Sequence, residues 1–299
     1  MKTLDTLFIG SSTRDLLMQV AEPPESDRRI SATSFTRACG GVAATAAVAH
    51  QSLGGVTGLL SAIGDDRTGQ EIREELEGWQ FEYLNFLVYP GRASSLSMIQ
   101  VESNGKRCLT CYGGCIDALT FDQIDRTLLC STRALHIGVM DFDVALELCR
   151  YMRAETDALI SIDGGNIPLE ATKRLLPYAD YFIPDNKTAE KTIGLGPEEA
   201  CRWYVDHGCK TAAVTAAERG TWAFDGSELI HADAPRVRTV DTTGAGDNFH
   251  GSFLYALRRG WPLPRCLRFA NIFASLSCEG MGGRSAIPSL ETVLSLMDG

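Results

Sequence analysis

The sequence predicts an α/β fold in which a doubly wound, mostly parallel sheet is flanked by helices on both faces. Short apolar runs alternate with amphipathic stretches along the 299 residues, a pattern typical of parallel strands joined by helices. Hydrophobic residues make up 44% of the chain and charged residues 22%, a composition that supports a large buried core. No linker or repeat divides the chain, so residues 1–299 are predicted to form a single domain.

The predicted strands and helices follow one another in a regular order. Strands are short apolar runs, whereas helices are amphipathic or, in the first case, built from small residues after Gly40 and Gly41. The predicted strands span residues 6–10, 56–63, 134–137, 158–162, 181–183 and 211–215. The predicted helices span residues 43–53, 68–78, 144–156, 169–176, 188–193 and 249–257.

Two segments, residues 15–38 and 92–112, break this rhythm. Polar and apolar residues alternate within them, for example in the run SMIQVE at residues 97–102. Such alternation indicates strands with one solvated face, and we expect exposed antiparallel strands in both segments.

Charge and composition exclude several classes of partner. A net charge of −10 at pH 7 argues against nucleic acids and anionic membranes, both of which bind basic surfaces. No apolar run approaches the ~20 residues of a membrane span, and the N-terminus lacks the pattern of a signal peptide. We therefore expect a cytoplasmic protein that meets anionic ligands with local positive groups.

The cysteines are expected to be reduced thiols. They are scattered along the chain, mostly in apolar contexts that suit buried thiols. The spacing of Cys108, Cys111 and Cys115 raises the alternative of a metal site, but a structural zinc site needs four ligands and no nearby histidine completes the set. A strand and loop is the favoured interpretation of that segment.

The segment 240–253, which reads VDTTGAGDNFHGSF, carries the strongest functional signal. Gly244, Ala245 and Gly246 have almost no side-chain bulk, so their N–H groups can converge at the positive end of the helix predicted to follow. Such a point binds anions and can stabilise the charge of a phosphoryl group in transfer. Asp247, kept ionised by the helix terminus, would accept the proton of an attacking hydroxyl. The structural alternative is a helix-capping aspartate after a glycine turn.

This segment resembles the C-terminal signature of the ribokinase-like (PfkB) family of carbohydrate kinases. Every fixed position of the family pattern D-T-x-G-A-G-D-x-F is filled between Asp241 and Phe249, and the resemblance runs from about residue 7 to 288. It implies that Asp247 is the catalytic base and that residues 244–246 form the anion hole. It also implies that the two irregular segments form a small β lid over a sugar.

For the sugar, the resemblance implies binding by Asp15, by the Gly40-Gly41 pair and by the helix that follows the glycines. Asp15 would accept hydrogen bonds from two hydroxyls, and strand ends are where such sheets place ligands. Thr45 stands where a sugar-binding asparagine is usual in the family. An exposed loop aspartate and tight helix–sheet packing are the structural alternatives.

Two arginine positions extend this comparison. Arg107 matches a lid arginine that approaches the transferred phosphate in several relatives, a role that suits a guanidinium. Arg29, with its neighbour Arg28, stands where relatives resembling sulfofructose kinase carry a basic residue that faces an anionic sugar. Both positions are also compatible with solvated surface charges.

The nucleotide site is implied by the resemblance alone. No G-x4-G-K-[ST] loop occurs, and no G-x-G-x-x-G follows a strand, which argues against P-loop kinases and dinucleotide enzymes. In the family, adenine lies across a loop and helix near the C-terminus. The residues implied to bind ATP are Asp185, Thr215, Glu218, Gly220, Asn271 and, through its backbone, Gly246.

The resemblance implies sites for two metal ions. Asp185 and Thr188 occupy the Asn and Glu positions of an N-x-x-E motif that orients magnesium-bound water in many relatives. Mg²⁺ is nevertheless expected, because it arrives with ATP and keeps much of its water shell. Asp241 and Thr243 match residues that hold a monovalent cation together with the C-terminal loop, so K⁺ is a further expected cofactor.

These patterns predict an ATP-dependent kinase that phosphorylates a primary hydroxyl of a small sugar. The AATAAVA helix, the F-H-G run at residues 249–251 and the Gly-Gly-Arg run at 282–284 resemble ketohexokinase and sulfofructose kinase relatives, which favours a ketose or an anionic sugar. A nucleoside or sugar acid is the alternative acceptor, and a non-catalytic sensor is the alternative class. Exposed strand edges in the lid predict a homodimer.

Overall fold

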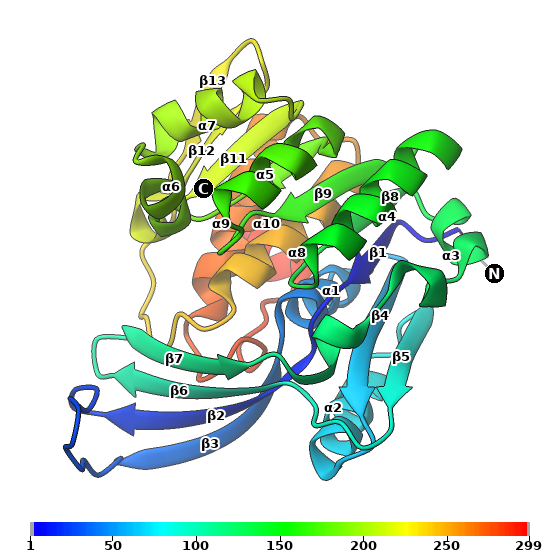
Figure 1. Ribbon diagram of the computed structural model, residues 1–299. Helices are drawn as coiled ribbons and strands as arrows, with labels where there is room; N and C mark the ends of the chain where they lie inside the picture. Colours follow the sequence, from blue (N-terminus) through cyan, green and yellow to red (C-terminus); the bar gives the residue numbers. More distant parts are fainter. Residues whose placement is uncertain (1–2, 298–299) are drawn as a thin grey trace.

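The computed structural model describes residues 3–297, which form two sheets and their flanking helices (Figure 1). Within these residues the larger sheet has nine strands, and seven of them, from β11 to β5, run parallel. Strands β12 and β13 add an antiparallel edge. The predicted mostly parallel α/β fold is therefore confirmed. In spatial order the strands are β13 (Leu229–Ala232), β12 (Thr221–Phe224), β11 (Thr211–Thr215), β10 (Tyr181–Ile183), β9 (Leu159–Asp163), β8 (Ala134–Ile137), β1 (Thr6–Ile9), β4 (Thr57–Gly64) and β5 (Tyr83–Tyr89).

Helices cover both faces of this sheet (Figure 1). Each set buries its apolar side chains in a separate core cluster. On one face lie α1 (Val42–Ser52), α2 (Arg67–Glu77), α8 (Ala245–Arg258), α9 (Leu263–Ser277) and α10 (Leu290–Met297). On the other lie α3 (Arg126–Cys130), α4 (Phe142–Glu155), α5 (Leu169–Leu175), α6 (Asn186–Ile193) and α7 (Pro197–Asp206).

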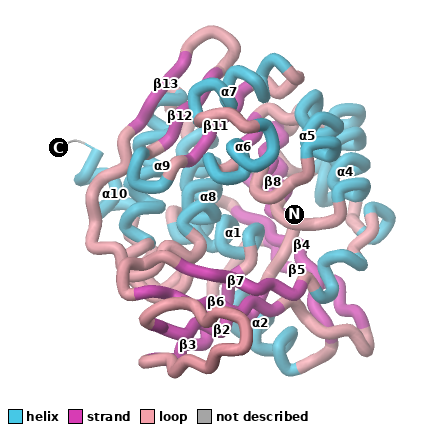
Figure 2. Tube along the Cα trace, turned by 60° about the vertical axis from the view of Figure 1, so that its left-hand side comes forward, coloured by secondary structure: helices cyan, strands magenta, loops and turns pink. Residues whose placement is uncertain are grey.

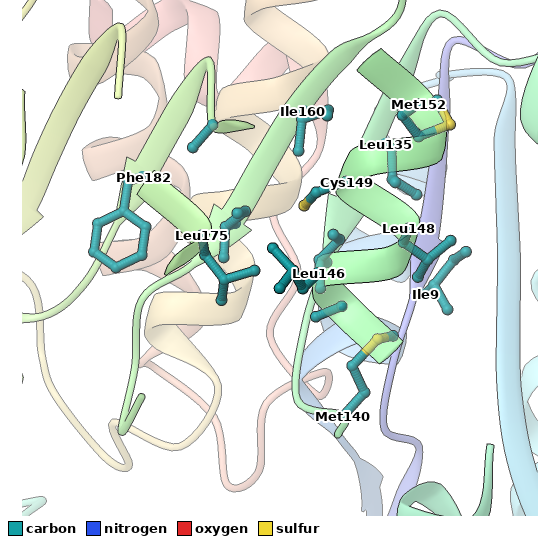
Figure 3. Close-up of a cluster of buried hydrophobic side chains, with 14 of the residues drawn as sticks. Ile9, Leu135, Met140, Leu146, Leu148, Cys149, Met152, Ile160, Leu175 and Phe182 are labelled. Carbon is teal, nitrogen blue, oxygen red and sulfur yellow. The ribbon is translucent and has the colours of Figure 1, made fainter. Parts of the chain in front are cut away.

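The two cores follow from the alternation of side chains along a strand. In β1, Leu7 and Ile9 belong to one cluster and Phe8 to the other, because successive side chains point to opposite faces of a sheet. Helix α4 contributes its buried stripe, which includes Leu146, Cys149 and Met152, at the spacing of one helical face (Figure 3). No helix within residues 3–297 combines the length and apolar character needed to cross a membrane.

A four-stranded sheet lies at one end of the molecule, near α1 and away from β12 and β13 (Figures 1 and 2). We call it the small sheet. The segments predicted to carry lid strands supply all of its strands, but β2 and β6 pair in parallel rather than antiparallel. The two strands belong to different segments, and the long connection through the main sheet lets them run in the same direction. In spatial order its strands are β3 (Ser34–Gly40), β2 (Thr13–Val20), β6 (Leu96–Glu102) and β7 (Arg107–Tyr112).

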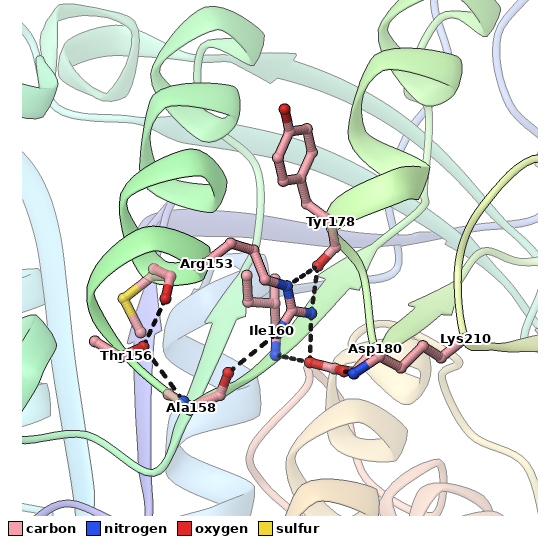
Figure 4. A network of polar contacts seen from close by, with 8 residues as sticks. Arg153, Thr156, Ala158, Ile160, Tyr178, Asp180 and Lys210 are labelled. Atoms are coloured by element: carbon pink, nitrogen blue, oxygen red, sulfur yellow. Dashed lines mark hydrogen bonds and ion pairs between the residues drawn. The ribbon is translucent and has the colours of Figure 1, made fainter.

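An ion-pair network around the buried Asp180 fixes the amino-terminal edge of the large sheet (Figure 4). Asp180 is 3% exposed and accepts hydrogen bonds from the guanidinium of Arg153 at 2.6 Å and from the N–H of Ile160 at 2.7 Å. Lys210 pairs with its other oxygen. Burial alone would raise the pKa of Asp180, but these partners outweigh it, so the pKa lies below its ordinary value. The network joins α4 to the starts of β9 and β11.

Candidate active site

The candidate site lies at the carboxyl ends of the parallel strands, where the strand order reverses. Strands β4 and β8, which are far apart in the sequence, flank β1 on its two sides. Such switch points are where open α/β sheets bind ligands. Gly41 precedes α1 at this edge with a φ of 97°, and a Cβ there would lie 2.5 Å from the carbonyl oxygen of Ser11. Only glycine allows this close approach.

The GAG motif forms the first turn of α8 rather than a turn ahead of it. The helix begins at Ala245, whereas the sequence predicted a start at Phe249, so Asp247 lies inside the helix. Gly244 precedes it with a φ of 74°, which glycine adopts at no steric cost. The N–H of Ala245 donates to the carbonyl of Thr242 at 3.3 Å, and the next N–H groups have no partner within the helix. This arrangement can hold an anionic group, the role predicted for residues 244–246.

Asp241 ties the motif to the C-terminal loop. It is fully buried, and one carboxylate oxygen accepts the N–H and the hydroxyl of Thr243, at 2.9 and 2.7 Å. The other oxygen accepts the N–H of Gly282 at 2.8 Å. A carboxylate has about four acceptor sites, so room for one further ligand remains. Asp241 and Thr243 therefore fit a cation only as part of a larger set of oxygens.

Asp247 is partly buried, and its pKa is raised to about 7. Burial is the largest cause, followed by the negative charge of Asp163, while His250 and Arg107 act in the opposite direction. The sequence predicted that the helix terminus keeps this carboxylate ionised. The surroundings in the structure act in the opposite direction, because desolvation and a second carboxylate raise the pKa. A carboxylate that titrates near neutral pH suits a general base.

Sequence reasoning missed two neighbours of Asp247. Asp163 ends β9, and His250 follows one turn later on α8; its Nε2 lies 3.6 Å from a carboxylate oxygen of Asp163. A spacing of three residues places Asp247 and His250 on the same helical face, which is a signal the sequence contained. The approach of Asp163 depends on how β9 packs against α8, and local sequence does not encode it.

Apart from Arg29, the residues predicted to bind sugar lie together. Asp15 on β2 is buried, accepts a hydrogen bond from Thr13 at 2.8 Å, and has a pKa raised chiefly by burial. A Cβ at Gly40 would overlap its carboxylate, so glycine is required there. Thr45 is also buried, and its methyl group would lie 3.3 Å from a Cβ at Gly244. The predicted sugar residues thus reach the anion site at the start of α8.

Arg284 joins this group, although the sequence assigned it no contact. Its guanidinium donates to the hydroxyl of Thr45 at 3.2 Å and to the carbonyl of Gly40 at 2.7 Å. It also pairs with Glu75 of α2 at 2.6 Å, and its side chain is only 6% exposed. The positive charge of Arg284 is therefore matched within the protein.

The two arginines predicted near the substrate lie in different places. Arg107 begins β7 and donates to the hydroxyl of Thr242, which in turn donates to the carbonyl of Gly105 at 3.3 Å. These contacts bring the turn between β6 and β7 onto the motif loop. Arg29 is exposed in the loop between β2 and β3. Since the register pairs Thr13 with Gly40 at the site, this loop emerges at the opposite end of the small sheet.

Asp185 and Thr215 stand at the carboxyl ends of neighbouring strands of the large sheet. Asp185 follows β10, is exposed, and caps α6 by accepting the N–H of Thr188 at 2.7 Å. Thr215 ends β11 and forms a β-bridge with Asp185. Thr188 is buried, so the exposed carboxylate of Asp185 is the group of this pair that can meet hydrated magnesium.

The remaining predicted nucleotide residues surround the turn after β11. Glu218 is exposed in a 3-10 turn at Ala217–Arg219, and Gly220 follows with a φ of 79° in a position where a Cβ would overlap Ala232. Asn271 on α9 is buried; it accepts from Thr221 at 2.7 Å and donates to Ala232 at 2.8 Å. Its amide therefore supports the turn, which leaves Glu218 and the backbone to face a nucleotide.

Comparisons with known proteins agree with this geometry. Residues 4–290 match the model of the pfkB family carbohydrate kinase. Deoxyribokinase of Salmonella typhi is 28% identical, covering 96% of this chain and 97% of the relative. A nucleoside kinase of Methanothermobacter thermautotrophicus is 25% identical, covering 95% and 92%. Ribokinase of Thermotoga maritima has the same fold, with a TM-score of 0.85 at 23% identity, covering 99% of this chain and 100% of that one.

Proposed function

Because the chain belongs to the pfkB family of carbohydrate kinases, we propose that it transfers the γ-phosphoryl group of ATP directly to a primary hydroxyl of a small sugar. The single observation that carries this proposal is the start of α8. There a carboxylate with a pKa of about 7 stands within the turn whose N–H groups are free to receive an anion. A base and an anion site at one point are what in-line phosphoryl transfer requires.

Each group then has a defined task. The carboxylate of Asp247 accepts the proton as the sugar oxygen bonds to phosphorus, and the bond between phosphorus and the bridging oxygen of ADP breaks. The N–H groups of Gly246 and Asp247 stabilise the charge on the transferred group. Arg107 adds a positive charge from the small sheet. ATP supplies the phosphoryl group when bound, and Mg²⁺ would neutralise its charge.

The acceptor is proposed to be a neutral sugar, with a ketose as first choice. Asp15 and Thr45 offer polar groups for hydroxyls beside the anion site. An anionic sugar has less support, because Arg284 is already paired with Glu75 and Arg29 lies at the far end of the small sheet. The relatives named as deoxyribokinase and nucleoside kinase make deoxyribose and nucleosides necessary members of any acceptor panel.

The nucleotide is proposed to lie across the turn between β11 and β12. Gly220 lets the chain turn tightly there, Glu218 and Thr215 border the turn, and Asn271 braces it from below. Asp185 would hold water of the Mg²⁺ shell from the end of β10. K⁺ is proposed beside Asp241 and Thr243, where it would use the remaining acceptor site of the carboxylate.

We also propose that a second copy of the chain covers the small sheet. The register places Phe35, Met98 and Tyr112 on one face, and they are 58%, 46% and 59% exposed. Asp15 points to the opposite face, toward the candidate site. Arg37 and Thr110 share this face, and large exposed apolar side chains on a sheet face of this kind favour self-association.

ADP release with Mg-ATP tests the function directly. We would assay ketoses, deoxyribose, ribose, sulfonated sugars, sugar acids and nucleosides, with Asp247→Asn beside the native protein. Asp206→Asn, which changes an exposed aspartate at the end of α7, is the matched control. Turnover that falls at least about 100-fold in Asp247→Asn alone is expected. Binding of ATP without turnover on any acceptor would instead support the sensor.

A further inference from the structure

A buried ion pair lies beneath the first turns of α8. His250 and Asp163 have side chains that are 5% and 13% exposed, and Nε2 of His250 lies 3.6 Å from the carboxylate. The same carboxylate oxygen of Asp163 accepts the N–H of Gly165 at 2.7 Å, which fixes its position at the end of β9. Nδ1 of His250 is buried without a partner among the described residues. The polar contact of this ring among the described residues is therefore the one that Nε2 makes with Asp163.

This histidine differs from two other buried ones. Burial lowers the pKa of His50 and of His136 to about 3, so both are neutral at physiological pH. Burial acts on His250 in the same direction, but the negative charges of Asp163 and Asp247 outweigh it and raise the pKa above its ordinary value. Among these three histidines, His250 is the one whose surroundings favour the protonated form.

The groups near the pair come from α8 and β9 themselves and from three further elements, β8, β7 and β2. His136 of β8 packs against His250 with ring centroids 4.9 Å apart. Nδ1 of His136 also forms a hydrogen bond with the hydroxyl of Ser161 on β9 at 3.1 Å. Asp247 is one turn away on α8, and Arg107 of β7 and Asp15 of β2 also act on it. Two carboxylates, Asp163 and Asp247, thus share one imidazolium. Without that cation, the charge of Asp163 would hold the proton on Asp247.

We propose that His250, paired with Asp163, is a positioning residue that places a fixed positive charge one helical turn behind Asp247 and so keeps that carboxylate available as a base. Asp163 has a matching task, because it holds the imidazole charged and in place. The inference rests on the proposed role of Asp247. It assigns to the pair an electrostatic effect on a reacting group, which differs from a contribution to packing alone.

The pH dependence of kcat/KM separates these two roles. His250→Gln keeps a polar side chain but removes the charge. We therefore expect the rising limb of the pH profile of kcat/KM, which reports the ionisation of Asp247, to move to higher pH by about one unit or more. Activity should fall about tenfold at pH 6 and less than about threefold at pH 9. His50→Gln, which replaces a neutral buried histidine hydrogen-bonded to Thr6 and Thr57, is the matched control and should leave the limb in place.

A second substitution tests the pairing. Asp163→Asn in the His250→Gln background removes the repulsive charge together with the cation, so the limb should return toward its native position. A uniform loss of activity at all pH values in His250→Gln, with no movement of the limb, would overturn the proposal and leave a packing role.

Nitrogen NMR of the native protein supplies a readout that needs neither a variant nor activity. The His250 imidazole should remain doubly protonated through pH 7, and Asp247→Asn should lower its pKa. A neutral His250 at pH 6 would overturn the proposal even if the variants fail to fold. Full activity in Asp247→Asn would instead refute the base assignment, while the NMR titration would still report the charge of the Asp163–His250 pair.

Discussion

At the scale of single residues, Asp247 carries a stability penalty that its chemistry explains. Its folded pKa of about 7 lies above the ordinary value for aspartate, so ionisation disfavours the folded state. The penalty is absent below about pH 4, grows as the pH rises through the folded pKa, and is complete above it. Strained or desolvated groups of this kind are common at catalytic positions.

Asp247→Asn should therefore stabilise the protein at pH 8 by about 1–3 kcal/mol, because the amide keeps the shape without the charge. At pH 4 the two proteins should have similar free energies of unfolding. Urea unfolding at the two pH values measures both differences. A variant that is less stable than the native protein at pH 8 would contradict the assigned burial penalty.

Arg284 is the second residue whose loss has a defined cost. It joins the C-terminal loop to Thr45, Gly40 and Glu75 through a nearly buried guanidinium. Arg284→Met should lower the free energy of unfolding by about 2–4 kcal/mol, since Glu75 and two other acceptors lose their donor. It should also raise the KM for sugar, because Thr45 lines the proposed sugar site.

Chemical unfolding and steady-state kinetics check these two effects. Arg73→Met, in the same helix as Glu75 and packed on Phe86, is the control for loss of an arginine stem. Unchanged stability and KM in Arg284→Met would show that the contacts of the guanidinium neither stabilise the fold nor position Thr45.

At the scale of elements, the two ends of the large sheet have different tasks. The carboxyl end carries the candidate site, whereas the amino end carries the Asp180 network. Asp180→Asn should lower the free energy of unfolding by about 2–4 kcal/mol, because Arg153 and Lys210 lose a shared partner. The native protein should lose this contribution as the pH falls below about 4, since the pKa of Asp180 is depressed.

Thermal unfolding between pH 3 and 7 measures the contribution of Asp180, with kcat/KM recorded beside it. The rate should stay within about twofold of native at a temperature where both proteins are folded, because the network is remote from α8. A large fall in kcat/KM without loss of stability would contradict this division of tasks.

Elements also show where sequence reasoning succeeds and fails. The strands at Tyr181–Ile183 and Thr211–Thr215 were predicted at their observed bounds, because each is a short run that begins directly after a charged residue, Asp180 or Lys210. The start of α8 was missed, because glycines read as a turn even where they form the first turn of a helix. Local sequence patterns therefore predict whether a segment is a helix or a strand better than they predict the residue at which a helix begins.

The residues of the candidate site also divide into those that local sequence predicts and those that it does not. The motif at 241–249 was found because its residues are contiguous, Gly40 because a glycine pair precedes a small-residue helix, and Asp15 because it comes just after the first predicted strand. Asp163 was missed because its contact with His250 joins segments that are distant in sequence. Arg29 was predicted near the sugar, but the hairpin register carries its loop away. Contacts set by strand register and helix docking cannot be deduced from local composition.

At the scale of the whole molecule, the small sheet connects assembly to the site. One face carries Asp15 and the other the exposed apolar side chains proposed to meet a second copy. Phe35→Asp combined with Met98→Asp should convert a dimer into a monomer, because two carboxylates would be buried without partners. Light scattering coupled to size exclusion measures the mass. Val88→Asp, at an exposed apolar position on β5, is the control. A native monomer at micromolar concentration would contradict the proposal.

The central claim is that Asp247 is the base of a sugar kinase. The measurement that tests it most directly is kcat/KM for the accepted sugar between pH 5.5 and 9, for the native protein and Asp247→Asn. We predict a native profile that rises through an apparent pKa of about 7 and a variant at least about 100-fold slower that lacks this limb. A variant with the same limb and a rate near that of the native protein would contradict the account.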